Sequence, residues 1–256
     1  MSPCVPCVSP CAQRLDEREA GPDACAVIVA GGSGERFGDS RGKQFVDLLG
    51  APLVSWSIMA FDRAPSVGHV VLVCPNARVN EVRERVLAPL DLRHEVTLAA
   101  AGATRQDSVL SGLMAVPEQF RLVAIHDGAR PLVEVDAIEA CLSLVRDRAD
   151  VDGAICASRV TDTLKVVDAD GKIVSTPDRN VFWSAQTPQA FSRDYVLSVH
   201  ERALLEGFVG TDDASLVEHV GGTVRVVSTP RDNIKVTVPE DLALAEATLR
   251  ARMGLT

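Results

Sequence analysis

The chain has 256 residues, an apolar content of 46% and a formal net charge of −9. This length allows one large domain or two small ones, and the acidic balance argues against a general nucleic-acid binder, which needs a basic face. No apolar run approaches the ~20 residues that span a bilayer, and the amino terminus lacks a secretory leader. We therefore expect a cytoplasmic protein that binds neither nucleic acid nor a membrane.

Residues 1–23 are rich in proline and charged residues, and we expect a disordered tail there. Three of the seven cysteines lie in this tail: Cys4, Cys7 and Cys11. No histidine stands near them in sequence to complete a metal site. The other four lie inside apolar runs, where cysteine behaves as a small hydrophobe: Cys25, Cys74, Cys141 and Cys156. We therefore predict no disulfide framework, and a single domain over residues 24–256.

Short apolar runs then alternate with helical patterns. Strands are predicted at residues 25–30, 69–74, 94–100, 121–127 and 152–158. Helices are predicted between them, at residues 52–64, 76–90, 104–116 and 135–149, with Asn76 and Thr104 as caps. Strands and helices that alternate with short links are typical of a doubly wound, mostly parallel sheet. We therefore predict an α/β, Rossmann-like fold.

The pattern changes after residue 158. Residues 159–183 alternate in polarity around Asp170–Gly171, a hairpin signal, and this segment is interpreted as a β-arm inserted into the domain. Further elements are predicted after the arm: helices near 192–206 and 212–220, a strand at 223–229 and an amphipathic helix at 239–252. An isolated hairpin is marginal in water, so we expect the arm to pack against a second copy of the chain in a homodimer.

The stretch VIVAGGSGERFG, residues 27–38, carries a glycine-rich loop directly after the first strand. Three glycines lie close together in it: Gly31, Gly32 and Gly34. Backbone N–H groups in such a loop favour anions, and ligands of open α/β sheets bind at the carboxyl ends of the strands. The loop is not a P-loop, because Lys43 comes nine residues after the last of these glycines. It also departs from the dinucleotide fingerprint, since Phe37 stands where the third glycine belongs.

Two cations in and beyond this loop, Arg36 and Lys43, suit the neutralisation of charge at a transferring phosphorus. Other polar or glycine positions fall at the ends of later predicted elements: Gly102, Arg105, Ser108, Asp127, Arg130, Thr211 and Lys235. A doubly wound sheet would collect these groups at one edge. For the loop taken alone, a solvated turn with its cations facing water is the alternative.

Seven motifs resemble, in order and spacing, those of the 2-C-methyl-D-erythritol 4-phosphate cytidylyltransferase family: AGGSGERFG…KQF, AGATRQDSVLSGL, HDGARP, TDTLK, DRNVFWSAQTPQAF, TDDASLVE and DNIKVTVPEDLALAE. The resemblance covers about residues 25–250. It implies a nucleotidyltransferase that moves CMP from CTP to methylerythritol phosphate and releases pyrophosphate. The product would be 4-diphosphocytidyl-2-C-methyl-D-erythritol, an intermediate of non-mevalonate isoprenoid biosynthesis.

The resemblance also implies roles for individual residues. The catalytic residues would be Arg36, Lys43, Arg179 and Lys235. The CTP-binding residues would be Ala30, Gly31, Gly32, Gly34, Gly102, Ser108 and Asp127. The polyol phosphate would be bound by Asp127, Arg130, Thr163, Arg179, Thr211 and Lys235, with Thr163 and Arg179 reaching in from the arm of the neighbouring subunit. A divalent cation, Mg²⁺, would be held mostly by phosphates, with Asp127 as its protein ligand. This chain carries Ala103 where the family often has an acidic residue.

Because the substrate phosphate is itself the nucleophile, catalysis would rest on positioning and charge neutralisation. His126 is expected to be structural, and Asp212 and Asp213 are either metal ligands or helix caps. Three other functions are compatible with parts of the pattern. They are a ribitol 5-phosphate cytidylyltransferase, a sugar-1-phosphate nucleotidyltransferase, which would not be expected to carry DNIKVT, and a nucleotide-binding regulatory module without catalysis.

Overall fold

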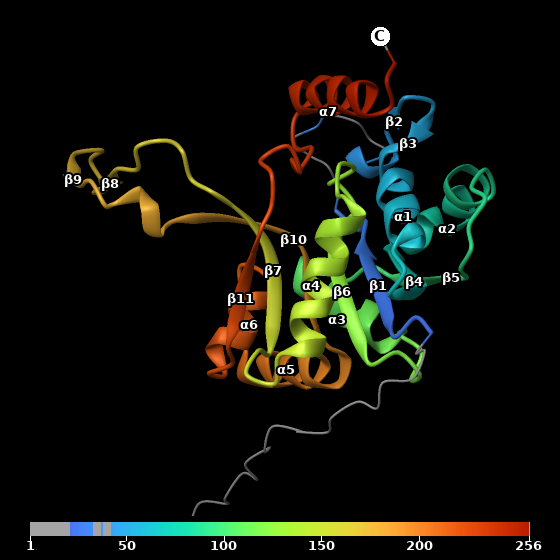
Figure 1. The fold of residues 1–256 in the computed structure, drawn as a ribbon, viewed down its shortest axis with the longest axis horizontal. Helices are drawn as coiled ribbons and strands as arrows, with labels where there is room; N and C mark the ends of the chain where they lie inside the picture. Colours follow the sequence, from blue (N-terminus) through green and yellow to red (C-terminus); the bar gives the residue numbers. More distant parts are fainter. Residues whose placement is uncertain (1–20, 33–36, 38–41, 256) are drawn as a thin grey trace, which may run out of the picture.

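The computed structural model describes residues 21–32, 37 and 42–255. A seven-stranded sheet with the order β11-β7-β10-β6-β1-β4-β5 lies at its centre (Figure 1). Its strands are, in chain order, β1 (Ala24–Val29), β4 (Val67–Cys74), β5 (Val96–Ala100), β6 (Leu122–Asp127), β7 (Gly153–Arg159), β10 (Trp183–Ser192) and β11 (Val224–Ser228). All neighbours pair in parallel except β10, which is antiparallel to β6 and β7. The predicted mostly parallel α/β sheet is confirmed.

Helices cover both faces of the sheet. One apolar core lies between the sheet and α1 (Leu53–Arg63) and α4 (Val135–Asp147). The second lies between the sheet and α3 (Arg105–Met114), α5 (Arg193–Glu206) and α6 (Asp213–His219). Successive residues of β1 alternate between the two cores, as the two-residue period of a strand requires. Because β10 is antiparallel to both β6 and β7, those two strands run in the same direction. The carboxyl ends of all the parallel strands therefore lie at one edge of the sheet.

The closing helix α7 (Pro239–Arg252) lies beyond that edge (Figure 1). Its buried Ala245 and Leu249 belong to a third, small apolar cluster with Leu48, Leu53 and Leu132. Leu48 lies on β2 (Asp47–Leu48), which pairs with β3 (Ala51–Pro52). This cluster fixes the segments that lead to and from the edge where ligands of such sheets bind.

One strand was not assigned from the sequence, and one helix assignment is corrected. The arm was predicted to end at residue 183 and no element was assigned to 184–191, yet β10 lies inside the central sheet, where it separates β6 from β7. The helix predicted at 76–90 is irregular: a 3₁₀ turn at Asn76–Arg78, a short α2 (Val79–Glu81) and a π-helical turn at Val82–Leu87. Asn76 lies within the first of these turns and provides no side-chain cap. Thr104, in contrast, caps α3 as predicted, in a capping box with Asp107.

The segment between β7 and β10 extends away from the sheet (Figure 1). It carries a small antiparallel pair, β8 (Val166–Val167) and β9 (Ile173–Ser175), joined through Gly171 with a φ of 81°. Its apolar side chains are exposed, with Val174 and Val181 at 64% and 73%. The tail predicted for residues 1–23 lies mostly outside the described residues. No helix in the described part of the chain is long and apolar enough to cross a membrane.

The four cysteines of the described chain are buried, as expected from their apolar runs.

Candidate active site

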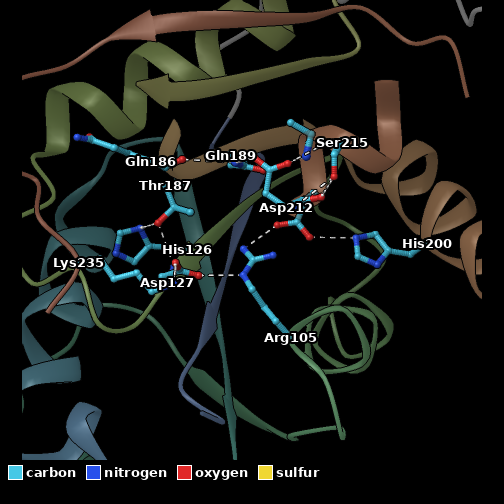
Figure 2. A network of polar contacts seen from close by, with 12 residues as sticks. Arg105, His126, Asp127, Gln186, Thr187, Gln189, His200, Asp212, Ser215 and Lys235 are labelled. Atoms are coloured by element: carbon cyan, nitrogen blue, oxygen red, sulfur yellow. Dashed lines mark hydrogen bonds and ion pairs between the residues drawn. The ribbon is translucent and has the colours of Figure 1, made fainter. Parts of the chain in front are cut away.

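Asp127 ends β6 at the carboxyl edge of the sheet and anchors a cluster of charges. Arg105 Nε donates to its Oδ1 at 3.0 Å, and Lys235 Nζ donates to its Oδ2 at 2.7 Å (Figure 2). Arg105 is the first residue of α3, and Lys235 lies between β11 and α7. Three distant segments of the chain therefore converge on one carboxylate.

The carboxylate of Asp127 is nearly buried, which alone would raise its pKa. The opposing charges of Arg105 and Lys235 outweigh burial and hold the pKa of Asp127 well below its usual range. Asp127 is therefore ionised at neutral pH and accepts hydrogen bonds only. Lys235 is 40% exposed on its side chain, so its ammonium can meet an incoming anion while remaining beside Asp127.

Arg105 also binds a second buried carboxylate. Its Nη2 donates to Asp213 Oδ2 at 2.9 Å, and the Asp213 side chain is 1% exposed. Burial raises the pKa of Asp213, but Arg105 and His200 reverse that effect, so its pKa is lowered. Asp213 thus links Arg105 to the interior of the protein. It does not cap α6, so the capping interpretation is wrong for this residue.

Asp212 is the cap of α6. Its Oδ1 accepts from the Ser215 amide at 2.9 Å, and its Oδ2 accepts from Gln189 Nε2 at 2.8 Å. Gln189 lies on β10, so the cap also joins α6 to the central sheet. Thr211, just before the cap, borders a small open pocket, lined also by Arg105, Gln106, Gly210, Asp212, Asp213 and Leu216.

His126 precedes Asp127 and is fully buried, which lowers its pKa to about 3. Its Nδ1 accepts from Thr187 Oγ1 at 3.0 Å, and its Nε2–H donates to the Arg130 carbonyl at 3.2 Å. Thr187 Oγ1 accepts in turn from the Asp127 amide at 3.0 Å. The neutral imidazole therefore holds the strand end in place, in agreement with its predicted structural role.

Gly31 and Gly102, two of the glycines predicted to bind nucleotide, lie against the start of α3. Ser108 Oγ accepts from the Gly102 amide at 3.0 Å and donates to the Thr104 carbonyl at 2.9 Å. A Cβ on Gly31 would lie 2.5 Å from the Cβ of Ala101, and one on Gly102 would lie 2.3 Å from the Cβ of Asp107. The backbone approach at this point therefore depends on glycine.

Lys43 begins a single 3₁₀ turn, Lys43–Phe45, that packs against the same loop. Its side chain is largely buried, and the neighbouring Gln44 amide lies 3.1 Å from where a Cβ on Gly32 would stand. The fully buried Ala30 leads into this loop from β1. Gly34 and Arg36 lie outside the described residues.

Two other residues predicted to bind the acceptor, Arg130 and Arg179, form hydrogen bonds with groups other than Asp127. Arg130 Nη1 donates to the Asn233 carbonyl at 2.8 Å, which ties the segment before Lys235 to the end of β6. Arg179 lies on the arm and donates to the Thr161 carbonyl at 2.6 Å. Among the described residues, neither Thr163 nor Arg179 forms a hydrogen bond or ion pair with Asp127, so one subunit does not gather the whole predicted set.

Sequence reasoning placed Arg105 at the end of the third strand but gave it no role. It also missed Thr187, because β10 was not recognised, and it gave Asp213 only the choice between cap and metal ligand. The signal for Arg105 was available, since it follows the Thr104 cap directly and so begins a helix at the ligand-binding edge.

Comparison with known proteins gives a consistent result. The model of the family described as 2-C-methyl-D-erythritol 4-phosphate cytidylyltransferase matches residues 24–251. A protein of that name from Syntrophotalea carbinolica is 44% identical over 224 residues, which cover 87% of this chain and 94% of that protein. Another, from Syntrophus aciditrophicus, is 41% identical over 234 residues, covering 91% of this chain and 98% of that protein.

Solved structures agree with the sequence relatives. The crystal structure of 4-diphosphocytidyl-2C-methyl-D-erythritol synthase from Anaerococcus prevotii superimposes with a TM-score of 0.78 at 27% identity, covering 89% of this chain and 96% of that one. The 2-C-methyl-D-erythritol 4-phosphate cytidylyltransferase from Thermus thermophilus gives a TM-score of 0.69 at 28% identity, covering 88% and 98%.

Proposed function

This chain belongs to the 2-C-methyl-D-erythritol 4-phosphate cytidylyltransferase family, and from that premise we propose how its residues carry out the reaction. The enzyme transfers a cytidylyl group from CTP to methylerythritol phosphate in isoprenoid biosynthesis. A phosphate oxygen of the acceptor attacks the α-phosphorus, and the bond from that phosphorus to pyrophosphate breaks. The products are 4-diphosphocytidyl-2-C-methyl-D-erythritol and pyrophosphate.

The nucleotide half of the site is assigned to the loop after β1 and to the start of α3. The close approach of Gly31 and Gly102 to neighbouring atoms supports a backbone surface on which phosphate and base can lie. Lys43, on the turn beside this loop, is assigned to the charge that develops on the α-phosphate. Arg36 receives the same role from the sequence resemblance alone. Ser108 is assigned to hold the nucleotide-binding backbone in place and not to contact the nucleotide itself, because its hydroxyl already accepts from the Gly102 amide and donates to the Thr104 carbonyl.

The acceptor half of the site is assigned to the edge around Asp127. Lys235 would bind the acceptor phosphate and orient its attacking oxygen, and Asp127 would position Lys235. The ion pair between these two residues is the observation that carries the proposal. Thr211 and Arg130 are assigned to the polyol and its phosphate, as the resemblance implies.

The arm completes the site in our proposal by crossing to a second subunit. Its exposed valine and isoleucine side chains need a partner surface, and a closed two-fold dimer supplies one. Thr163 and Arg179 would then enter the partner's acceptor site. The homodimer also accounts for the separation of these residues from Asp127 within one chain.

Mg²⁺ is proposed as the accompanying cation. In the described part of the chain no three histidine, cysteine, aspartate or glutamate side chains cluster as metal ligands, and both oxygens of Asp127 accept from cations. This donor set agrees with an ion held mainly by phosphate oxygens and water, to which Asp127 would contribute only lone pairs that Arg105 and Lys235 leave free. When bound, the ion would offset negative charge on the phosphates. We place the reaction in the cytoplasm, where CTP is made.

Pyrophosphate release from CTP tests the proposal. Purified protein with Mg²⁺ should release pyrophosphate when methylerythritol phosphate is added, and far less with ribitol 5-phosphate. Equal or faster turnover with ribitol 5-phosphate would move the protein to that sister activity. An absence of turnover with either acceptor, in protein shown to bind CTP, would favour a regulatory module.

A further inference from the structure

His200 is a buried histidine outside the residues assigned above. It lies on α5, its side chain is 0% exposed, and its Nε2 is 3.2 Å from Asp213 Oδ1. Neither ring nitrogen has a well-aligned hydrogen-bond partner among the described residues. Burying a polar ring with so little compensation is unfavourable, and the other buried positions of α5 are apolar. The histidine therefore calls for an explanation beyond packing.

Asp213 connects this histidine to the acceptor site. One of its oxygens faces His200, and the other accepts from Arg105 Nη2 at 2.9 Å. Arg105 uses its Nε for Asp127, so its planar guanidinium spans two carboxylates. Any rotation of that plane changes both contacts together.

We propose that His200 is a positioning residue for the acceptor site, acting through Asp213 and Arg105 on Asp127. The inference rests on the proposed binding of the acceptor phosphate by Lys235. His200 Nε2 faces Asp213 Oδ1 at 3.2 Å and keeps that oxygen turned away from Arg105. Without the imidazole, the Asp213 carboxylate can turn both oxygens toward the guanidinium. Arg105 then shifts from Asp127, and Asp127 holds Lys235 more tightly, so Lys235 is less available to the acceptor phosphate.

Two substitutions at His200 test this proposal. His200→Leu keeps much of the volume but removes the donor, and it should raise the KM for methylerythritol phosphate about tenfold, the lower end of losses seen when outer partners of a ligating group are removed. The dissociation constant for CTP, measured by calorimetry, should change less than this KM, because no hydrogen bond in the described chain joins Gly31 or Gly102 to His200, Asp213 or Arg105. His200→Gln places an amide donor near the position of Nε2 and should bring the KM back to within about threefold of wild type.

Val196→Ala on the same helix is the matched control, since it removes buried volume in α5 without touching the relay. It should lower the unfolding temperature and leave both substrate constants unchanged. An unchanged KM in His200→Leu overturns the inference. A rise that His200→Gln does not reverse, or that Val196→Ala reproduces, also overturns it.

Asp213→Asn provides a second route if His200→Leu does not fold. It keeps the shape of the side chain, removes its charge and should also raise the KM for methylerythritol phosphate; an unchanged KM would contradict the relay. Lys235→Met separates this inference from the proposed function. If that variant leaves the acceptor KM unchanged, the proposed role of Lys235 fails. If it raises the KM while His200→Leu does not, the relay alone fails.

Discussion

Lys235 Nζ lies 2.7 Å from Asp127 Oδ2, although 108 positions separate the two residues in the chain. The contact brings the segment after β11 to the end of β6 and leaves the lysine partly exposed. A cation held in this way needs little reorganisation when an anion arrives. The same pair makes part of the folding stability depend on pH.

Lys235→Met should weaken this pH dependence. In the wild type, the pKa of Asp127 is lower in the folded than in the unfolded chain, because Arg105 and Lys235 outweigh burial. The resulting stabilisation is fully present above the unfolded pKa near 3.9 and is lost as pH falls toward the folded pKa. The variant should lose on the order of 1 kcal/mol of unfolding free energy at pH 7, after allowance for the exposure of Lys235. The difference from wild type should shrink only as the pH falls toward the folded pKa of Asp127, which lies well below the unfolded value.

Urea unfolding at a series of pH values from 7 downward measures this effect, with Lys172→Met on the exposed arm as the matched control. A deficit that does not shrink as the pH approaches the folded pKa of Asp127 would show that the methionine acts through packing and not through the charge of Asp127.

Lys43→Ala should lower kcat at least about 100-fold, the scale of losing one preorganised charge contact. Affinity for CTP should fall less, because charge on the α-phosphate grows in the transition state. Single-turnover rates and CTP binding by calorimetry separate the two effects, with Lys172→Ala as the control. A loss confined to CTP affinity would identify Lys43 as a binding residue only.

Gly31→Ala should disturb the nucleotide half of the site. The new Cβ would lie 2.5 Å from the Cβ of Ala101, so the loop must move. Overpacking of this kind costs about 1–3 kcal/mol, and we expect a lower unfolding temperature together with weaker CTP binding. Gly21→Ala is the control, because its Cβ would meet nothing within 4 Å. CTP binding at wild-type strength in Gly31→Ala would place the nucleotide elsewhere.

Mixing two inactive variants tests the crossed arm. Lys43→Ala damages the site through the core and Arg179→Ala through the arm, so each homodimer should be inactive. After refolding together, half of the dimers should be mixed, and each mixed dimer should contain one intact site. Activity should therefore recover to about a quarter of wild type, as random pairing in a two-fold dimer requires. If mass spectrometry shows mixed dimers and activity stays at the parental level, Arg179 serves its own subunit.

Most of the fold could be predicted because its strands are short apolar runs with clear periodicity. The β1 strand, for example, was predicted at 25–30 and spans Ala24–Val29. The β10 strand could not be recognised in the same way. Its buried centre includes the polar residues Gln186, Thr187 and Gln189. Their polarity is tolerated because partners distant in sequence, such as Thr229 and Asp212, satisfy them.

The position of a candidate site residue was predictable where that residue ends a strand, as Asp127 does, or comes shortly after one, as Gly31 does. The partners of Arg105 could not be predicted from the sequence. Asp213 is 108 positions away, and the ion pair between Arg105 and Asp213 depends on how α6 packs against the sheet. The local sequence TDD suggests a cap at both aspartates, and only the folded chain distinguishes Asp212 from Asp213. Which of two adjacent aspartates caps the helix and which binds a distant arginine is decided by tertiary packing.

The position of β10 beside β7 gives the arm a simple topology. The two strands are antiparallel neighbours, with Trp183 opposite Arg159 at the point where the chain leaves the sheet. The arm is thus a long loop of a hairpin whose stem is already part of the core. Each doubling of such a loop costs only about 0.6 kcal/mol of closure entropy. Insertions, deletions and new side chains at its tip can therefore accumulate over evolution while the central sheet stays folded as it is.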